Sequence, residues 1–402
     1  MGSMSCNFVA RDTGCDPGTP AMHNQEKFEA RQTDTGSALL FSIGADKVLC
    51  LTREVPAFGW QRTDLSSAQI RRDMPHGRCT NFASARSVPV AGQPGLIHLA
   101  MVVNDGHNDH LYLSLSNPAS DTAWSAAPVW TACPFNAGSV PARLAIAGVQ
   151  IGEANDGLFI VVDIAGHAGS AAQLRSRYVI DAAQAGQPRW APHNVPVDAA
   201  AAIYASCLGR SRGGWDVDGL YLAARVGDKP QLIYAPLYHP FSPSMPAMPR
   251  RLALPDDLAA GTIAACRNAD NTASLFATAA GALYFFSAAN QFDGAQALQL
   301  VADPLFEDMR TLFAFAAGGR FTVWGLNGAG QVVTTSADQV YAAEPACWRR
   351  PRVVLSGADA MSPCLDRAQS AGSFFAKTAN RMVRVARSPV ADAWTVIEMA
   401  AL

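Results

Sequence analysis

The most polar run of the chain is the segment NDGHNDH at positions 104–110, which places two histidines among carboxylate and amide side chains. A third histidine, His167, lies in the segment DIAGHAGSAAQ of the next repeat. Imidazole and carboxylate groups together suit general acid–base catalysis, and they also suit a transition-metal site. We therefore expect His107, His110, His167 and Asp109 to be catalytic, and the three histidines to be the ligands if a divalent metal is the cofactor. The alternative is a solvated turn, since Asn and Asp are standard turn residues.

Arginine is the second candidate for binding chemistry, because one arginine lies on or beside each of several short runs of small residues. These arginines are Arg11, Arg86, Arg143, Arg210, Arg267, Arg310 and Arg367. A guanidinium group is well suited to hold a carboxylate, a phosphate or a polar sugar. The predicted ligand-binding residues are Arg86, Arg210, Arg267, Arg367, Asp366 and Trp324, with Asp366 as a counter-charge and Trp324 as a ring for stacking. Hydrogen bonds between sheets would explain the same arginines, and aromatic packing the same tryptophan.

These residues sit on a repeated pattern of strands. In each repeat a strand of small residues precedes an apolar β-hairpin, and a tryptophan or an apolar strand follows the hairpin. The seven hairpins start at Leu39, Leu99, Leu158, Leu220, Leu275, Arg320 and Ser373. Their starts lie 45 to 62 residues apart. The tryptophans that follow hairpins are Trp60, Trp124, Trp190, Trp348 and Trp394.

This repeat predicts an all-β protein, a seven-bladed β-propeller of four-stranded blades. Residues 1–402 then form a single domain, and residues 1–38 supply part of the first blade. The small-residue strands suit the innermost position, where the blades converge, and the tryptophans would wedge between adjacent sheets. The predicted innermost strands begin at Cys6, Cys79, Arg143, Tyr204, Ile263, Arg310 and Ser362. A double sandwich or a pair of all-β domains is the rival fold.

The cysteines follow the same pattern. Of the nine, five lie on the predicted innermost strands: Cys6, Cys79, Cys207, Cys266 and Cys364. They are spread singly, without the C-x-x-C pairs of a structural zinc site. We expect reduced thiols that pack as small core residues.

Charge and hydropathy exclude several classes of function. The net charge is −2, from 31 basic and 33 acidic side chains, which is too balanced for a nucleic-acid-binding protein. No apolar run is long enough to span a bilayer, so we expect a soluble protein without a membrane partner. The N-terminus lacks the layout of a signal peptide, which favours the cytoplasm, although secretion stays open if a signal was trimmed. The Ala- and Arg-rich composition is typical of a bacterial, GC-rich genome.

In architecture the repeats resemble the lectin-like propellers of bacteria and fungi, a group that includes the tachylectin-type sugar binders. The segments LFATAAGALYFF from Leu275 and FFAKTANRMVRVARSPVADAW from Phe374 carry the resemblance. It implies a carbohydrate ligand. The chain departs from multivalent lectins, however, because its hairpin loops differ in length and chemistry from copy to copy. That departure favours one specialised site over several equivalent ones.

Together these observations predict one small-molecule site at the mouth of the axial channel. The expected function is an enzyme that acts on a small polar or anionic organic molecule by lyase, cyclase or hydrolase chemistry. Two alternatives remain open, since propellers host all three functions. One is a carbohydrate-binding propeller without catalysis, and the other is a protein-interaction scaffold.

Overall fold

The computed structural model describes residues 28–55, 59–66, 68–86, 95–125, 127–133, 140–151, 155–165, 173–180, 189–195, 202–210, 218–226, 229–236, 250–253, 262–267, 273–287, 298–317, 320–337, 345–365, 371–379, 381–387 and 393–399. Almost every element among these residues is a β-strand, so the all-β prediction is confirmed. The one α-helix in the described ranges is α1 (Ala68–Asp73), and the short 3-10 helices are η1 (Asp121–Ser125), η3 (Pro304–Phe306) and η4 (Pro345–Cys347).

Five sheets each contain four consecutive strands, paired antiparallel in sequence order. The first is β5 (Arg78–Arg86), β6 (Leu96–Asn104), β7 (Asp109–Pro118) and β8 (Thr131–Cys133). The second is β9 (Val140–Ile151), β10 (Asn155–Ala165), β11 (Gln173–Ile180) and β12 (Arg189–Val195). The third is β13 (Ala202–Arg210), β14 (Asp218–Val226), β15 (Lys229–Pro236) and β16 (Arg250–Ala253).

The fourth sheet is β17 (Thr262–Arg267), β18 (Ala273–Ala279), β19 (Ala282–Ser287) and β20 (Leu298–Ala302). The fifth is β21 (Met309–Ala317), β22 (Arg320–Asn327), β23 (Gln331–Ala337) and β24 (Arg352–Ser356). Apolar and β-branched residues dominate these strands, as in VVTT of β23, and tight turns join them. Between β18 and β19, Ala280 (φ 47°) and Gly281 (φ 71°) both adopt the left-handed conformation of a two-residue hairpin turn.

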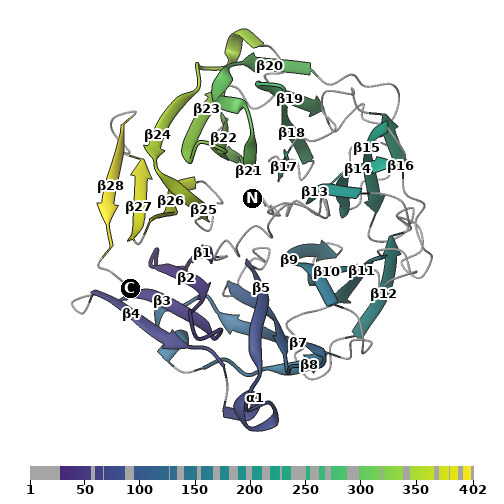
Figure 1. The fold of residues 1–402 in the computed structure, drawn as a ribbon, viewed down its shortest axis with the longest axis vertical. Helices are drawn as coiled ribbons and strands as arrows, with labels where there is room; N and C mark the ends of the chain where they lie inside the picture. Colours follow the sequence, from purple (N-terminus) through teal and green to yellow (C-terminus); the bar gives the residue numbers. More distant parts are fainter. Residues whose placement is uncertain are drawn as a thin grey trace.

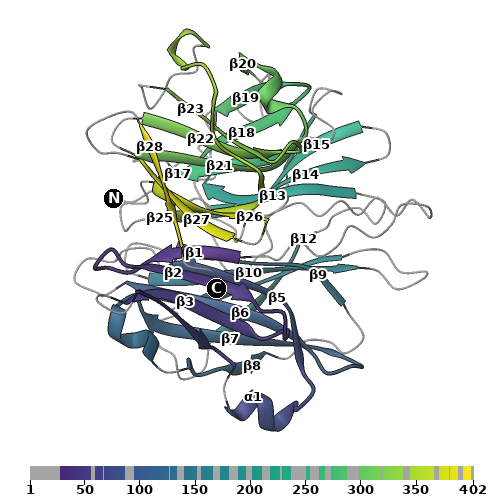
Figure 2. The ribbon, with the colours of Figure 1, turned by 60° about the vertical axis from the view of Figure 1, so that its left-hand side comes forward.

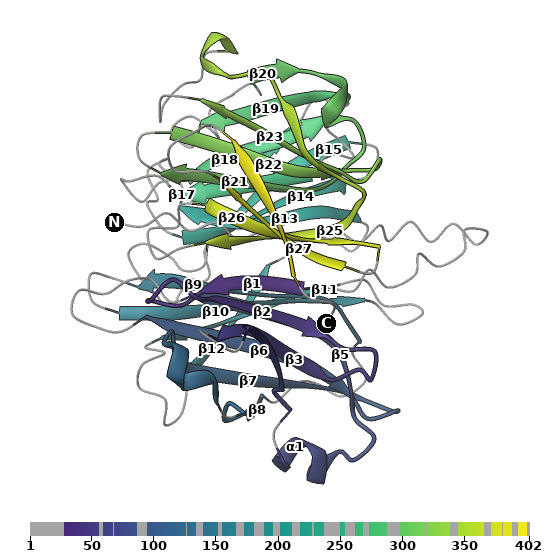
Figure 3. The same cartoon turned by 90° about the vertical axis from the view of Figure 1, so that its left-hand side faces the viewer.

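A sixth sheet has eight strands and contains both ends of the described chain. Its first half is β1 (Phe28–Gln32), β2 (Ala38–Ile43), β3 (Leu49–Val55) and β4 (Gly59–Asp64). Its second half is β25 (Ala358–Leu365), β26 (Ala371–Thr378), β27 (Arg381–Arg387) and β28 (Trp394–Glu398). The halves join through one parallel pair, Arg31 opposite Leu365, and they lie side by side in the turned views of Figures 2 and 3.

The groups of four strands stand around a common centre, and the first strand of each group lies innermost (Figure 1). This radial arrangement is that of a β-propeller. The predicted innermost strands that begin at Cys79, Arg143, Tyr204, Ile263, Arg310 and Ser362 overlap the observed ones. The first is different. The strand that pairs with β2 is β1, whereas the segment from Cys6 lies outside the described residues.

Aromatic rings pack between neighbouring groups of strands, as the tryptophan pattern predicts. Four tryptophans near outer strands meet an aromatic ring on the second strand of the preceding group, with ring centroids 5.3 to 5.9 Å apart. The pairs are Trp60 with Phe375, Trp124 with Phe41, Trp348 with Phe276, and Trp394 with Trp324. The pair of Trp60 on β4 and Phe375 on β26 lies between the two halves of the eight-stranded sheet.

The prediction of buried thiols is confirmed on three innermost strands, where Cys79, Cys266 and Cys364 are buried. Burial raises the pKa of the Cys266 thiol far above its ordinary value. It therefore behaves as a small apolar residue. Within the described ranges no helix has the length and apolar character that crossing a membrane requires.

Candidate functional site

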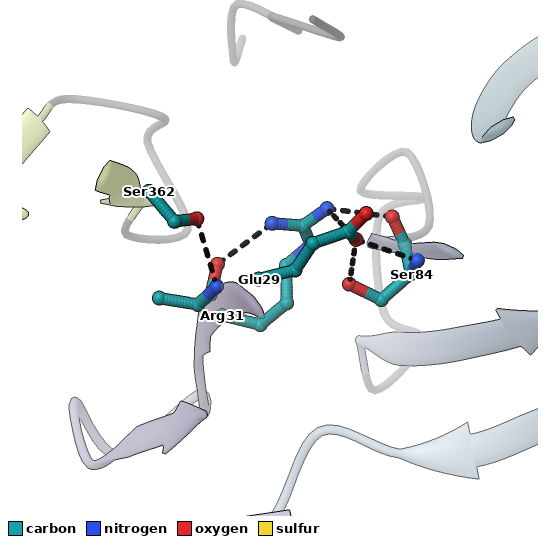
Figure 4. A network of polar contacts seen from close by, with 5 residues as sticks. Glu29, Arg31, Ser84 and Ser362 are labelled. Carbon is teal, nitrogen blue, oxygen red and sulfur yellow. Dashed lines mark hydrogen bonds and ion pairs between the residues drawn. The ribbon is translucent and has the colours of Figure 1, made fainter. Parts of the chain in front are cut away.

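The innermost strands meet in a network of polar contacts around the carboxylate of Glu29 on β1 (Figure 4). Its Oε2 accepts hydrogen bonds from the backbone N–H of Ser84 at 2.7 Å and from the Ser84 hydroxyl at 2.6 Å, and it lies 3.1 Å from an Arg31 nitrogen. Arg31 also donates to the Ser84 carbonyl at 2.6 Å. On the other side, Ser362 of β25 accepts from the Ala30 N–H at 3.0 Å. The network therefore joins β25, β1 and β5 near the centre.

Sequence reasoning missed this network, because FEARQ does not resemble the small-residue strands of the other repeats. Its alternation of apolar and charged residues is the signal that could have found it. Phe28 and Ala30 are buried in the core, while Glu29 and Arg31 face the neighbouring strands. The partners of Glu29 are protein groups, so the role supported by the contacts is structural.

Removing the carboxylate in Glu29→Ala should lower the free energy of unfolding by about 2–3 kcal/mol, because two donors of Ser84 and one of Arg31 lose their charged acceptor. Urea denaturation at neutral pH measures the loss. The matched control is Glu54→Ala, whose half-exposed carboxylate lies 3.6 Å from Arg384. That variant should lose less than about 1 kcal/mol. Equal losses in the two variants would contradict the central role of Glu29.

Arg86 serves as a clamp between two groups of strands. It donates to the Gln32 carbonyl at 2.8 Å and pairs with the Asp34 carboxylate, which also accepts from the Gly95 N–H at 3.1 Å. Only 8% of the Arg86 side chain is exposed. The structure thus favours the alternative interpretation that Arg86 forms hydrogen bonds between sheets, rather than the predicted contact with a ligand.

The loop 104–110 satisfies its own polar groups. Asp105 accepts hydrogen bonds from the backbone N–H groups of His107 at 2.8 Å and Asn108 at 2.7 Å, and His110 Nε2 lies 2.8 Å from its other oxygen. The N–H of Asn108 first, then His110 and the N–H of His107, hold the pKa of Asp105 far below its usual range. Asp109 accepts from the Asn104 amide at 2.9 Å. These are the contacts of a closed turn.

The described part of the structure does not support a metal site. No group of three or more His, Cys, Asp or Glu side chains that could hold a metal occurs within the described ranges. His167, the third predicted ligand, lies outside them, as do Arg367 and Asp366. A divalent cofactor thus remains a prediction of the sequence.

Among the described residues, the predicted catalytic loop and three of the predicted ligand-binding arginines lie at opposite ends of their strands. In the β5–β6 pair, Arg78 lies opposite Asn104, beside the histidine loop, whereas Arg86 lies opposite Ile97 at the far end of both strands. Arg210, opposite Asp218, and Arg267, opposite Ala273, occupy the same end of their strands as Arg86. The sequence pattern showed the strand but not its register. This register does not support one site that combines Arg86, Arg210 and Arg267 with His107 and His110, and the other predicted site residues stay predictions.

Trp324 is a core residue. It is fully buried, and its ring packs edge-on against Phe315, Phe374 and Trp394 with centroids 4.9 to 5.3 Å apart. No face of the ring is left for a ligand, which contradicts the predicted stacking role. The reason is its position at the middle of β22, facing the next group of strands.

A cavity of about 90 Å³ lies where the β21–β24 sheet meets strands β27 and β28. The residues around it are Thr322, Thr334, Thr335, Ser336, Arg349, Arg350, Arg352, Arg387 and Trp394. We call it the arginine pocket. Since one water needs roughly 10–15 Å³ on this scale, the cavity has room for several waters or for a group such as a carboxylate or sulfate.

Strand pairing and short hydrogen bonds position the pocket residues. Thr334 lies opposite Arg352 on β24, and Arg387 lies opposite Trp394 on β28. The Thr335 hydroxyl donates to the Arg349 carbonyl at 2.6 Å, and the Arg349 N–H donates to the Ser336 carbonyl at 2.9 Å. The segment that carries the arginines is therefore held against β23.

The pocket exists because one face of the sheet changes character along its length. Toward one end, Trp324, Leu326 and Val332 pack against apolar residues of β25–β27. Toward the other end, the side chains are the hydroxyls of Thr322, Thr334 and Ser336. The contact of this sheet with the preceding one, β17–β20, is apolar instead. Four aromatic rings pack together there: Phe276, Phe285, Phe321 and Trp348. The sequence signals for the pocket are the TTS of β23 and the WRRPR segment, whose arginines the sequence shows as the densest basic cluster.

The pocket carries four guanidinium groups, three hydroxyl-bearing threonines, a serine and an indole ring. Among the described residues that line it there is no Asp, Glu or His. This donor-rich set can hold ligand oxygens.

No protein-family model and no curated protein matches this sequence. Among solved structures, the chain is similar to a lectin from Aleuria aurantia, at 10% identity and a TM-score of 0.44, over 94% of this chain and 96% of that one. It is also similar to AofleA from Arthrobotrys oligospora, at 9% identity and a TM-score of 0.43, over 100% and 91% of the two chains. A third similarity is to the WD40 domain of SCAP from fission yeast, at 9% identity and a TM-score of 0.47, over 94% and 92%. At this level of similarity no ligand or activity carries over to this chain.

Proposed function

We propose that this protein is a carbohydrate-binding β-propeller without catalysis, and that the arginine pocket is its binding site. In this proposal the eight-stranded sheet consists of two blades that touch through β1 and β25, so that one domain has seven blades. The observation that carries the function is the lining of the pocket by Thr322, Thr334, Ser336 and four arginines. Hydroxyl and guanidinium groups bind the hydroxyls of a sugar, and the half-buried ring of Trp394 offers an apolar edge beside them.

Two observations favour binding over catalysis. The described lining of the pocket has no group for proton transfer, and the histidine loop is a turn whose carboxylates are already engaged. The varied hairpin loops of the sequence support one site rather than a ring of equivalent sites.

The test is a glycan array with the full chain, followed by titration calorimetry on any glycan that binds. The double variant Thr322→Val, Thr334→Val should weaken binding by about 10-fold or more, because each valine removes a hydroxyl while keeping the shape of the side chain. The control is Thr395→Ala on the exposed face of β28, which should bind within about 2-fold of the parent. Absence of binding to every glycan would refute the proposal.

A further inference from the structure

We propose that the outer strand β28 is an interaction edge, through which two copies of this chain associate by antiparallel pairing of their β28 strands. This inference goes beyond the proposed carbohydrate function and does not depend on it. β28 is the last strand of the eight-stranded sheet and lies at the outer rim of the molecule (Figure 1). Among the described strands its one hydrogen-bonded neighbour is β27, so the backbone groups on its other side face outward.

The pairing with β27 determines which backbone groups of β28 face outward. The Met399 N–H donates to the Met382 carbonyl at 3.1 Å, so these two residues form a hydrogen-bonded pair. Hydrogen-bonded and non-hydrogen-bonded pairs alternate along antiparallel strands, and the register of β28 with β27 has no shift. The next residues of β28 that bond to β27 are therefore Ile397 and Thr395. The residues whose N–H and C=O groups point away from β27 are Trp394, Val396 and Glu398.

The side chains at the centre of β28 are apolar and exposed. Val396 is 46% exposed and Ile397 is 49% exposed. Consecutive residues of a strand point to opposite faces, so β28 presents a β-branched apolar side chain on each face. Such side chains stabilise the pairing of one strand with the next, and an exposed apolar edge readily pairs with another chain. The side chains and the outward backbone groups therefore both suit strand addition.

The other described outer strands carry features that discourage such pairing. β8 has only three residues, β12 contains Pro192, and β16 begins with two arginines. β20 and β24 have shifted registers with their neighbours, which is typical of a bulge. β4 carries Arg62 and Asp64. Short length, proline, charge and bulges are the usual protections of an edge strand, and among the described outer strands β28 lacks all four at its centre.

The partner that β28 fits is a second copy of β28. A twofold axis at Val396 pairs every outward residue, because Val396 then faces its own copy and Trp394 faces Glu398. Arg387 lies opposite Trp394 on β27, so the same row across the interface contains residues of opposite charge. The two Glu398 residues lie at opposite ends of the paired strands, whereas parallel pairing would place them side by side. This interface is self-complementary and closes at two copies.

The first test is the oligomeric state of the full chain. Two five-residue strands bury less than the roughly 1,600 Å² of a standard interface, so we expect a dimer that dissociates on dilution. Sedimentation velocity between about 1 and about 200 µM should show monomer at the low end and dimer at the high end. Over the same range, amide hydrogen exchange of the Val396 N–H should slow by at least about 10-fold, because this group becomes bonded in the dimer. The N–H groups of the outer strand β4 should exchange equally at both concentrations.

Variants locate the interface. Val396→Pro and, separately, Ile397→Lys should each weaken dimerisation at least about 10-fold. Proline removes an outward N–H while keeping the bonds to β27, and lysine places a charge at the centre of the edge. The matched control is Leu298→Lys on β20, where the side chain is 37% exposed on an outer strand, and it should dimerise within about 2-fold of the parent. If Val396→Pro does not fold by circular dichroism, the half-exposed Ile397 provides the test.

Three outcomes would overturn the inference. The first is a chain that stays monomeric over the whole concentration range. The second is a dimer that both β28 variants leave intact or that forms without slower exchange at Val396, because association would then use another surface. The third is growth to larger oligomers, since pairing about a twofold axis stops at two copies. These measurements contain no glycan, so their result is separate from that of the glycan array.

Discussion

Replacing Trp324 by alanine should lower the free energy of unfolding by about 3–5 kcal/mol, one of the two largest effects we expect from a single change. The ring is fully buried, and it contacts Phe315 on its own sheet and Phe374 and Trp394 on the next group of strands. Alanine would remove these contacts and leave a cavity at the seam. The β21–β24 sheet and strands β25–β28 would then no longer be held firmly in place relative to each other, so ligand binding in the adjacent arginine pocket should weaken.

Equilibrium unfolding in urea, followed by tryptophan fluorescence and circular dichroism, measures this loss. Trp324→Phe retains part of the ring and should lose about half as much or less. Val129→Ala is the surface control, because the Val129 side chain is 82% exposed, and it should change stability by less than about 0.5 kcal/mol. A loss of unfolding free energy below about 1 kcal/mol for Trp324→Ala would contradict this prediction and show that the side chains around Trp324 repack easily.

The second large effect is a loss of stability on acidification, centred on His98 of β6. This residue is fully buried at a bulge in the β6–β7 pairing, and burial lowers its pKa from 6.5 to about 4. In the folded protein His98 therefore stays neutral down to about pH 4, whereas in the unfolded chain it takes up a proton below about pH 6.5. Its contribution to stability is complete above pH 6.5 and is lost as the pH falls through 4. The full loss is about 3 kcal/mol, at roughly 1.4 kcal/mol per pKa unit.

Urea unfolding of the parent and of His98→Gln at a series of pH values tests this effect. The variant loses packing at every pH, so the informative quantity is the change in unfolding free energy between neutral and acidic pH. That change should be smaller in His98→Gln by about 2–3 kcal/mol. His107→Gln removes an exposed histidine from the loop and should keep the slope of the parent. Parallel pH profiles for the parent and His98→Gln would contradict the assignment.

The strand pattern could be read from the sequence because it is local. Alternating apolar residues and turn residues predict each hairpin without knowledge of its neighbours, as in the turn at Ala280 and Gly281. The tryptophans after the hairpins were predicted to lie between sheets, and Trp60, Trp124, Trp348 and Trp394 do so. The strand β1 escaped prediction, because Glu29 and Arg31 look unsuited to an innermost strand. Their charges pair with each other and with Ser84, which lies more than 50 residues away in the chain.

The candidate site could not be read in the same way. The sequence analysis placed the histidines and arginines at one site, but the pairing register of β5 and β6 places Arg86 far from the loop that contains His107. The arginine pocket draws on β22, β23, the segment before β24, and strands β27 and β28. No spacing along the chain predicts that Thr322 and Arg387 face one cavity.

By itself, then, the sequence determined the all-β class, the repeated strand–hairpin–tryptophan unit and the burial of Cys79, Cys266 and Cys364 on innermost strands. These properties depend on each residue's own hydrophobicity and on neighbours within a few positions. Only the tertiary structure decided which charged side chains are bound internally, as Arg86 is by Asp34, and which line an open cavity, as Arg350 does. The reason is physical. The state of a polar side chain depends on the partner that a neighbouring strand brings to it, and that partner can lie hundreds of residues away, as Ser362 does from Ala30.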